Sequence, residues 1–403
     1  MTETTTESRQ QVNLGRMQWG MLLVGGVLVL ISLALMFSAD TQKSMLQSYL
    51  WGWEFWGGLS FGCFAMTLLH HSVKGSWGTS VLRIWEAGGG VATLLGFGIL
   101  FIPILLTMFS GSSVLYAWAD PNIVSKDHIL QARHALLNPI GASVVTILVL
   151  GIWTYLAGLM RQSTLRQDQS LDAIEEKKRF TWGPVGLVTF VLSATLAFTV
   201  WFMSLDTHWS STMYAPWFTV GHAFAALSLA VFIVCRFAKH DPYSEIMSPA
   251  LTKDLGNMML TLTMFFSYLS FSQYLIIWSG NVPEFTQYYH TRAEGGWVWV
   301  GLSMVALQFF IPFLLLVNPS TKRYPRNLMY VAAWIFVVRI IDSYWVVLPV
   351  FPNRATPMPV FTDVLAFVGL GAMWFGIFAT QIRKAPLLPV YDQRLKEALH
   401  HHA

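Results

Sequence analysis

The sequence predicts an all-α polytopic membrane protein with ten transmembrane helices and both termini in the cytoplasm. Three observations favour this fold class: the composition, the spacing of the apolar stretches, and the distribution of lysine and arginine. Of the 403 residues, 54% are hydrophobic and 11% are charged, and the mean hydropathy is +0.51. In soluble domains, roughly a quarter of the residues are charged. This composition therefore indicates that most of the chain lies in lipid.

Ten apolar stretches of about 20 residues have the length that crosses a hydrocarbon core of ~30 Å as a helix. In chain order they cover residues 17–37, 51–71, 82–109, 136–160, 183–203, 215–236, 254–278, 296–317, 327–348 and 361–381. Polar residues inside these spans are few, and each is costly to bury in lipid. They therefore carry most of the functional argument.

The polar, amphipathic connection 161–182 predicts a cytoplasmic surface helix. It joins residues 17–160, with spans 1 to 4, to residues 183–381, with spans 5 to 10. Spans 2–5 and spans 6–9 then form two four-helix bundles of the same up-down sense, with spans 1 and 10 at the periphery. The tails 1–16 and 382–403 are expected in the cytoplasm.

The distribution of positive charge predicts the orientation. Nineteen of the 25 Lys and Arg residues fall on the side of the N-terminus and five fall on the opposite side, while Arg339 lies inside span 9. The side richer in Lys and Arg is the cytoplasmic side. The net charge of +4 is then a mark of topology and does not indicate a nucleic-acid partner.

The sequence predicts no metal site and no cofactor ligated by this chain. Its two cysteines, Cys63 and Cys235, fall inside spans, whereas an iron-sulfur cluster usually takes four cysteine ligands. Paired haem ligands need matching depth, but His70 and His71 end span 2 on the inner side, while His222 lies in the outer third of span 6. No phosphate-binding GxxxxGK[ST] motif is present. Electrons, if they pass here, need carriers in a partner protein.

The connections on the outer side are rich in aromatic residues and poor in charge, which favours a docking surface for an extracytoplasmic partner. They cover residues 109–135, 204–214, 279–295 and 349–360.

Two segments resemble a known family. The end of span 5 has the sequence WFMSLDTHWSSTMY (201–214), and span 7 contains FSYLSFSQYLIIWSGN (266–281). With ten spans and this length, residues 15–385 resemble the smaller NrfD-like (polysulfide reductase membrane-subunit-like) integral subunit of alternative complex III.

The resemblance implies a complex in the bacterial cytoplasmic (inner) membrane that oxidises menaquinol and reduces cytochrome c or a similar periplasmic carrier. It implies haem c and iron-sulfur clusters in partner subunits, namely a multihaem cytochrome c and a periplasmic iron-sulfur protein. A larger NrfD-like sister subunit is the further partner, and the family's quinol site is associated with that sister.

Several polar residues are expected at the inner side. His70 and His71 end span 2, Glu86 opens span 3 one helical turn after Arg83, and Asp254 opens span 7. Arg83 and Glu86 can pair with each other or with a neighbour. The group is either an interfacial anchor that reaches water or the mouth of a proton half-channel, because His and carboxylates are the usual relay groups in membranes.

A second polar group is expected toward the outer side. Asp342 and His222 lie at similar depth, so a contact between them is possible. Arg339 lies one turn deeper than Asp342, and an Arg at the centre of a span costs about 2.5–3.5 kcal/mol on insertion scales. The two residues form either a structural ion pair or part of a functional polar centre. Asp206 and His208 are expected at the outer mouth, where exposure alone also accounts for them.

Span 7 carries a polar stripe, formed by Ser267, Ser270 and Gln273 with Tyr268 and Tyr274 beside them. Such residues form either interhelical hydrogen bonds or a water wire that links the two polar groups.

Glu54, near the outer end of span 2, is the candidate for a quinol site, with exposure to water as its alternative.

The function that these observations favour is an integral membrane subunit of a quinol-oxidising respiratory complex. It contributes a proton-transfer path and, as a second contribution, quinol binding. The alternatives are a stand-alone secondary transporter with its site between the bundles, and a structural anchor for peripheral subunits.

Overall fold

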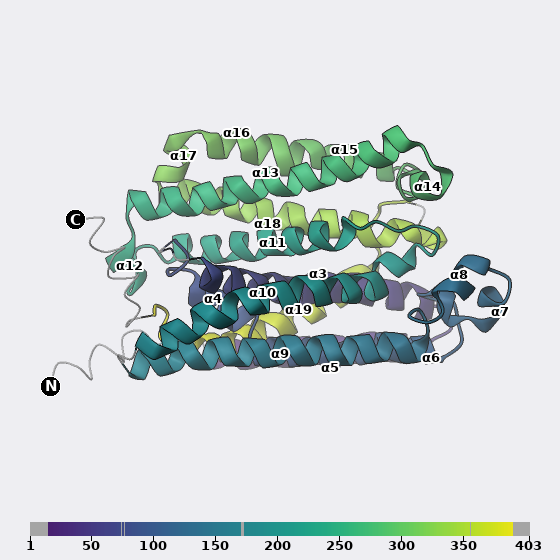
Figure 1. The fold of residues 1–403 in the computed structure, drawn as a ribbon, viewed down its shortest axis with the longest axis horizontal. Coiled ribbons are helices and arrows are strands. Elements are labelled where there is room, and N and C mark those ends of the chain that lie inside the picture. The colour runs from purple at the N-terminus through teal and green to yellow at the C-terminus, as the bar shows by residue number, and fades with distance from the viewer. Residues whose placement is uncertain (1–14, 74, 76, 171–172, 355, 390–403) are drawn as a thin grey trace.

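A computed structural model describes residues 15–73, 75, 77–170, 173–354 and 356–389. The described residues form helices and connections without a strand (Figure 1), so the predicted all-helical class is confirmed. Within the described residues, nine helical segments are long and apolar enough to cross a membrane, which makes the chain a multi-pass helical membrane protein. They are Gly15–Leu35, Leu82–Phe109, Pro139–Gln169, Ala173–Leu205, Tyr214–Arg236, Pro249–Gly280, Trp297–Val317, Pro325–Val350 and Phe361–Ile382.

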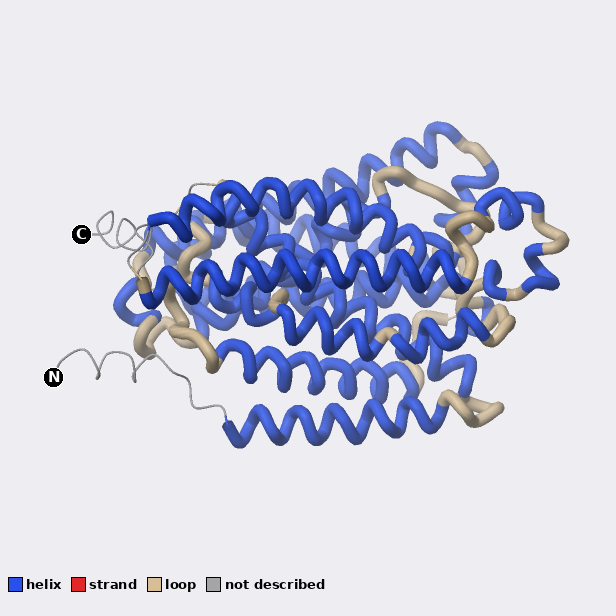
Figure 2. The backbone as a smooth tube through the Cα atoms, turned by 60° about the horizontal axis from the view of Figure 1, so that its bottom comes forward, coloured by secondary structure: helices blue, strands red, loops and turns tan. Residues whose placement is uncertain are grey.

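The long helices run side by side, and the short helices and loops gather at the two ends (Figure 2). The long helices are α2 (Gly15–Leu35), α3 (Gln42–Ser72), α9 (Pro139–Gln169), α10 (Ala173–Trp201), α11 (Tyr214–Arg236), α13 (Pro249–Gly280), α18 (Pro325–Val347) and α19 (Phe361–Ile382). One end, the α14 end, carries α7 (Pro121–Val124), α8 (His128–Arg133), α14 (Pro283–Thr291) and the 3-10 turns Ala117–Ala119, Met203–Leu205, Leu348–Val350 and Pro352–Arg354. The opposite end, the α12 end, carries α12 (Tyr243–Ile246) and α17 (Pro319–Arg323).

Two of the predicted spans are interrupted helices. Span 3 consists of α4 (Leu82–Gly88), α5 (Val91–Leu100) and α6 (Ile102–Phe109). Its first break follows three glycines, where Gly90 is extended, and α6 has a proline in its first turn. Span 8 consists of α15 (Trp297–Met304), the π-helical turn η3 (Val305–Phe310) and α16 (Ile311–Val317).

Helix α3 is the hub of the packing. It contacts α10, α11 and α19 extensively, while α11 in turn packs on α18 and α13. Nearly all of its residues from Met45 to His71 are buried. Because protein surrounds this helix, its polar side chains find partners, and it does not need the apolar surface of a lipid-facing helix. This explains why α3, although 31 residues long, is not one of the nine segments that are apolar enough to cross a membrane.

The outer pairs of helices flank this hub. Helix α9 packs between α10 and α5, α13 packs on α16 and α17, and α2 packs along α19. Helices α2 and α19 are antiparallel, because Gly25 contacts Met373 and the side chain of Arg383 donates to Gln18 at 2.7 Å. The first described helix therefore begins at the end of the bundle where the last one finishes.

The expected surface helix at 161–182 is wrong. Helix α9 continues to Gln169 and α10 begins at Ala173, so these residues extend two long helices. Arg179 donates hydrogen bonds to Ser163 and Gln167 and ties the two extensions together. Residues such as Gln, Glu, Lys and Arg favour helix, so a polar segment prolongs a helix beyond its apolar part. The predicted tails 1–16 and 382–403 lie mostly outside the described residues.

Candidate functional site

Four titratable side chains from three helices meet in the half of the bundle toward the α14 end. Glu54 comes from α3, His222 from α11, and Arg339 and Asp342 from α18. His222 Nε2 lies 3.2 Å from Glu54 Oε1, and Arg339 Nη1 donates to Asp342 Oδ2 at 2.6 Å. Asp342 is also close enough to Glu54 and His222 to interact with them electrostatically. We call these four residues the buried charge cluster.

The structure corrects two expectations about this cluster. The closest charged partner of His222 is Glu54, which comes from the other half of the protein, and not Asp342. Glu54 does not face water, because only 1% of the residue is exposed. Arg339 and Asp342 form the ion pair that was one of the two alternatives from the sequence, and their part in a functional polar centre stays a prediction.

Glycines allow the three helices to approach so closely. A Cβ atom on Gly58 would lie 2.0 Å from the His222 ring, and one on Gly62 would lie 2.1 Å from the His222 carbonyl oxygen. Gly58 and Gly62 have the GxxxG spacing that permits close helix contact in membranes. On α11, a Cβ atom on Gly221 would lie 2.4 Å from Arg339 Nη2. The GxxxG motif was visible in the sequence, and it points to the α3–α11 contact that pairs Glu54 with His222.

The charges of the cluster balance only when it holds one extra proton. Two carboxylates and one guanidinium leave one negative charge when His222 is neutral, and a proton on His222 or on a carboxylate brings the sum to zero. A buried site penalises a net charge strongly, so the neutral composition is favoured. Arg339 gains further stabilisation because its guanidinium lies 4.4 Å from the centre of the Phe266 ring.

Three buried polar atoms of the cluster are available for further hydrogen bonds. Glu54 Oε2, His222 Nε2 and Arg339 Nε have no hydrogen-bond partner among the described residues, since the 3.2 Å contact of His222 with Glu54 lacks hydrogen-bond geometry. Buried polar atoms are normally satisfied by protein or by ordered water. The cluster can therefore form hydrogen bonds with a water molecule or with another group that exchanges protons.

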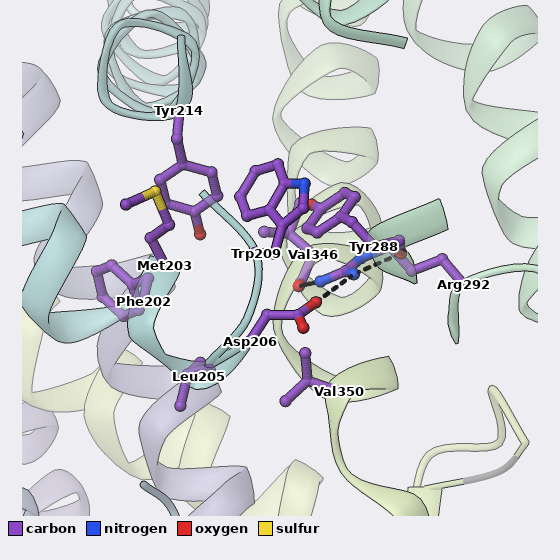
Figure 3. Close-up of a pocket in the computed structure, with 10 residues that line it drawn as sticks. All are labelled: Phe202, Met203, Leu205, Asp206, Trp209, Tyr214, Tyr288, Arg292, Val346 and Val350. Atoms are coloured by element: carbon purple, nitrogen blue, oxygen red, sulfur yellow. Dashed lines mark hydrogen bonds and ion pairs between the residues drawn. The ribbon is translucent and has the colours of Figure 1, made fainter. Parts of the chain in front are cut away.

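A small cavity is lined by residues of the connection after α10, of α11, of α14 and of the end of α18 (Figure 3). Arg292 lies against it, donates to the carbonyl oxygens of Tyr288 and Val346, and lies 3.8 Å from Asp206. The cavity volume of about 10 Å³ is close to the minimum that holds one water molecule. Burial raises the pKa of Asp206 above its usual value, although Arg292 opposes this shift. Asp206 is thus a carboxyl that accepts a proton more readily than an exposed aspartate.

Two tyrosines lie between the cluster and Asp206. Tyr214 is within electrostatic range of Glu54 and Asp206, and Tyr288 is within range of Asp342 and Asp206. Both side chains line the small cavity (Figure 3). Hydroxyl groups both donate and accept hydrogen bonds, but the hydroxyl of Tyr288 and Asp206 Oδ2 have no hydrogen-bond partner among the described residues, so a water molecule in the cavity would have to join them.

His208 was expected beside Asp206 at this mouth, but its hydrogen-bond partner lies elsewhere. His208 is half-exposed and its Nε2 lies 2.6 Å from Asp127 Oδ2. This hydrogen bond lowers the pKa of Asp127, which also caps α8. His208 therefore joins two outer connections at the surface, whereas Asp206 lies inside.

A second charged group lies near the α12 end, where α4 meets α9. Arg83 pairs with Glu86 at 2.8 Å, which confirms the predicted partnership, and it also pairs with Asp168. Thr164 donates to Glu86 at 2.7 Å. The expectation that this group reaches water as an interfacial anchor is wrong, because Arg83 and Glu86 are buried. Sequence reasoning missed Thr164 and Asp168, since both lie on the extension of α9 that was assigned to a connection.

Other expected members of the inner group have different surroundings. His70 and His71 are fully buried and their rings contact each other, with Trp77 against His70. Asp254 on α13 is exposed, so it does not belong to a buried relay.

The polar stripe of α13 forms interhelical hydrogen bonds. Ser270 accepts from Trp217 Nε1 at 2.8 Å, and Gln273 accepts from Ser211 at 3.2 Å. These contacts lie near the α14 end, and the alternative of a water wire between the two charged groups stays a prediction. Ser267, Tyr268 and Tyr274 line a larger cavity beside them, and both tyrosines are exposed.

In the part of the chain that the structure describes, no group of three or more His, Cys, Asp or Glu residues is arranged to hold a metal ion. Comparison with models of known protein families and with curated protein sequences gives no match for this chain. The class that the helices define is a multi-pass helical membrane protein with charged residues buried among its spans.

Proposed function

We propose that this chain is an integral membrane subunit of a respiratory quinol-oxidising complex and that it contributes a path for protons. The observation that carries the proposal is the buried charge cluster, whose four groups are neutral only with one mobile proton. A purely structural anchor does not need such a cluster, because apolar residues of similar volume pack at a lower free-energy cost than buried ions.

The two segments that resemble alternative complex III both lie at this cluster. Segment 201–214 contains Asp206 and ends at Tyr214, and segment 266–281 begins at Phe266, over which Arg339 lies. The resemblance therefore includes residues near this centre, while other residues of 266–281, such as Tyr268 and Phe271, are exposed.

In the proposed topology, the chain crosses the bacterial cytoplasmic membrane ten times, with α3 as the tenth span. The α12 end is cytoplasmic because the connections at that end carry most of the Lys and Arg. Both termini then lie in the cytoplasm, and the contact between Gln18 and Arg383 at one end of the bundle supports this arrangement. Two four-helix units, of spans 2–5 and spans 6–9, meet at the contact of α3 with α11.

Protons pass between the cluster and the periplasmic side through Tyr214, Tyr288 and Asp206. On the cytoplasmic side, Glu86 with Asp168 and Thr164 forms the corresponding polar group. The chain acts as a subunit without cofactors of its own. Menaquinol supplies electrons and protons, and haem c and iron-sulfur clusters in partner subunits carry the electrons to a periplasmic acceptor. The larger NrfD-like sister subunit and membrane lipid complete its surroundings.

Purification from the native membrane in mild detergent tests this proposal. The chain is expected to co-purify with haem-containing and iron-sulfur subunits, and the preparation is expected to oxidise menaquinol. The chain separated from its partners should show no haem or iron-sulfur absorbance. A chain that purifies alone and transports a solute in liposomes would instead be a secondary transporter.

A further inference from the structure

A large apolar cavity lies beside the buried charge cluster, between α13 and span 8. Its volume is about 1310 Å³, above the usual range of about 300–1,000 Å³ for small-molecule sites. Side chains of α13, α14, α15, η3 and α18 line it, and most of them are apolar or aromatic. Asp342 of the cluster is among them.

The cavity contains a polar side chain without a partner. Gln308 is 4% exposed, and neither its amide nitrogen nor its amide oxygen has a hydrogen-bond partner among the described residues. A buried amide that lacks its hydrogen bonds is destabilising, because both polar atoms have lost their contacts with water. A ligand that both accepts and donates a hydrogen bond in this cavity would remove that cost.

The local sequence explains why Gln308 lies at this place. Pro312 has no N–H group to donate to the carbonyl oxygen of Gln308, four residues earlier. The helix adopts the π-helical turn Val305–Phe310 directly before this proline. Such turns are frequent at functional sites, and this one carries Gln308 into the cavity wall.

The cavity adjoins the lipid-facing surface. Tyr268 and Phe271 of α13 are 65% and 62% exposed, and Leu302 and Val305 of span 8 are 57% and 52% exposed. All four also line the cavity. A hydrocarbon tail can therefore extend from the interior to the lipid between α13 and span 8.

We propose that this cavity binds a quinone-class lipid, with its ring between Gln308 and Asp342 and its isoprenoid tail between α13 and span 8. A quinone carbonyl accepts a hydrogen bond and a quinol hydroxyl donates one, and a glutamine amide serves both forms. A quinol hydroxyl also donates to the carboxylate of Asp342. This inference rests on the proposed function only for the identity of the lipid.

A phospholipid fits the polar groups less well. Gln308 lies 11 residues from Trp297, about 16 Å along the helix, which is near the middle of a hydrocarbon core of ~30 Å. A phosphate stays at the membrane surface, so acyl chains would meet the amide and leave it without hydrogen bonds. The cation nearest that surface, Arg292, already donates to two backbone carbonyl oxygens.

The test uses the purified complex in nanodiscs depleted of quinone and a photoreactive azido-menaquinone as the probe, without turnover. Crosslinks are expected in segments 264–278 and 298–310, and unlabelled menaquinone should suppress them. Gln308→Leu should weaken probe binding by about tenfold or more, as expected from the loss of two hydrogen bonds. The matched control, Gln18→Leu on α2, should bind the probe as the unmodified complex does.

Leu302→Trp provides a second variant that does not depend on a buried substitution, because Leu302 is on the exposed rim. It should block the tail and abolish crosslinking. Crosslinks confined to other segments, equal binding by Gln308→Leu, or a phospholipid that menaquinone does not displace would overturn the inference. Failure of the proposed function is distinguishable. The probe would then still label this cavity while the chain purifies without haem and iron-sulfur subunits.

Discussion

The ion pair between Arg339 and Asp342 allows a quantitative prediction. Asp342→Asn removes the carboxylate that lies 2.6 Å from the guanidinium, and both residues are only 5% exposed. Breaking a buried pair by removing one partner costs about 3–5 kcal/mol, because the guanidinium loses the carboxylate that is paired with it. We expect the free energy of unfolding to fall by this amount.

The double variant Arg339→Leu, Asp342→Leu separates the charge from the packing. It removes both ions together, and a matched apolar pair is often as stable as the ions that it replaces. We therefore expect it to recover most of the stability that Asp342→Asn loses. Reversible unfolding of the purified protein in mixed micelles, by titration with sodium dodecyl sulfate, measures the differences.

Glu175→Gln is the matched control. Glu175 pairs with Lys178 at the same i, i+3 spacing and the same 2.6 Å, but the Lys178 side chain is 51% exposed. Solvated pairs contribute about 0–1 kcal/mol. If Asp342→Asn costs no more than Glu175→Gln, Arg339 is not held by Asp342, and the assignment of the cluster as a buried ionic centre is wrong.

Three further predictions concern packing, pH and topology. Gly58→Ala should separate α3 from α11 and strongly lower the yield of folded protein, because the added Cβ would overlap the ring of His222. A Cβ on Gly26 would have no atom within 4 Å, so Gly26→Ala is the control. It should behave as the unmodified chain in size-exclusion chromatography. The hydrogen bond with His208 lowers the pKa of Asp127 in the folded protein. The stability that ionised Asp127 contributes is therefore complete above the pKa of an unfolded aspartate, about 3.9, and is lost as the pH falls through the lower pKa of the folded state. Protection of the α8 amides from hydrogen exchange should therefore fall below about pH 4, and Asp127→Ala, which removes the cap, should lower this protection at every pH. A reporter fused within 281–294 should be exported and one at the C-terminus should be cytoplasmic, and a cytoplasmic 281–294 would reverse the topology.

Much of the fold was predictable because a lipid environment imposes long apolar helices. Helix α3 is the informative exception. Its expected span began at residue 51, whereas the helix begins at Gln42. Hydropathy does not mark the ends of a helix that is buried in protein on all sides. The extensions of α9 and α10 were missed for a related reason, since polarity marks the end of a membrane span but not the end of a helix.

The candidate site was predictable only where its contacts are local. Arg83 with Glu86 and Arg339 with Asp342 are i, i+3 pairs, so the helix period places them on one face. The approach of His222 to Glu54 depends on how α3 and α11 are rotated and packed, which the periodicity of one helix does not contain.

The larger cavity could not be predicted from the sequence either. It depends on a π-helical turn and on the separation of α13 from span 8, neither of which hydropathy reports.

The central claim is that the buried charge cluster carries protons. Glu54→Gln tests it most directly, because the substitution keeps the size of the side chain and removes a titratable group. The measurement is the number of protons translocated per electron by the complex in sealed vesicles during quinol oxidation, with Asp254→Asn, an exposed carboxylate near the α12 end of α13, as the control. We expect an assembled Glu54→Gln complex whose proton translocation is lost and an Asp254→Asn complex that translocates normally. An assembled Glu54→Gln complex that moves as many protons per electron as the unmodified one would contradict the claim.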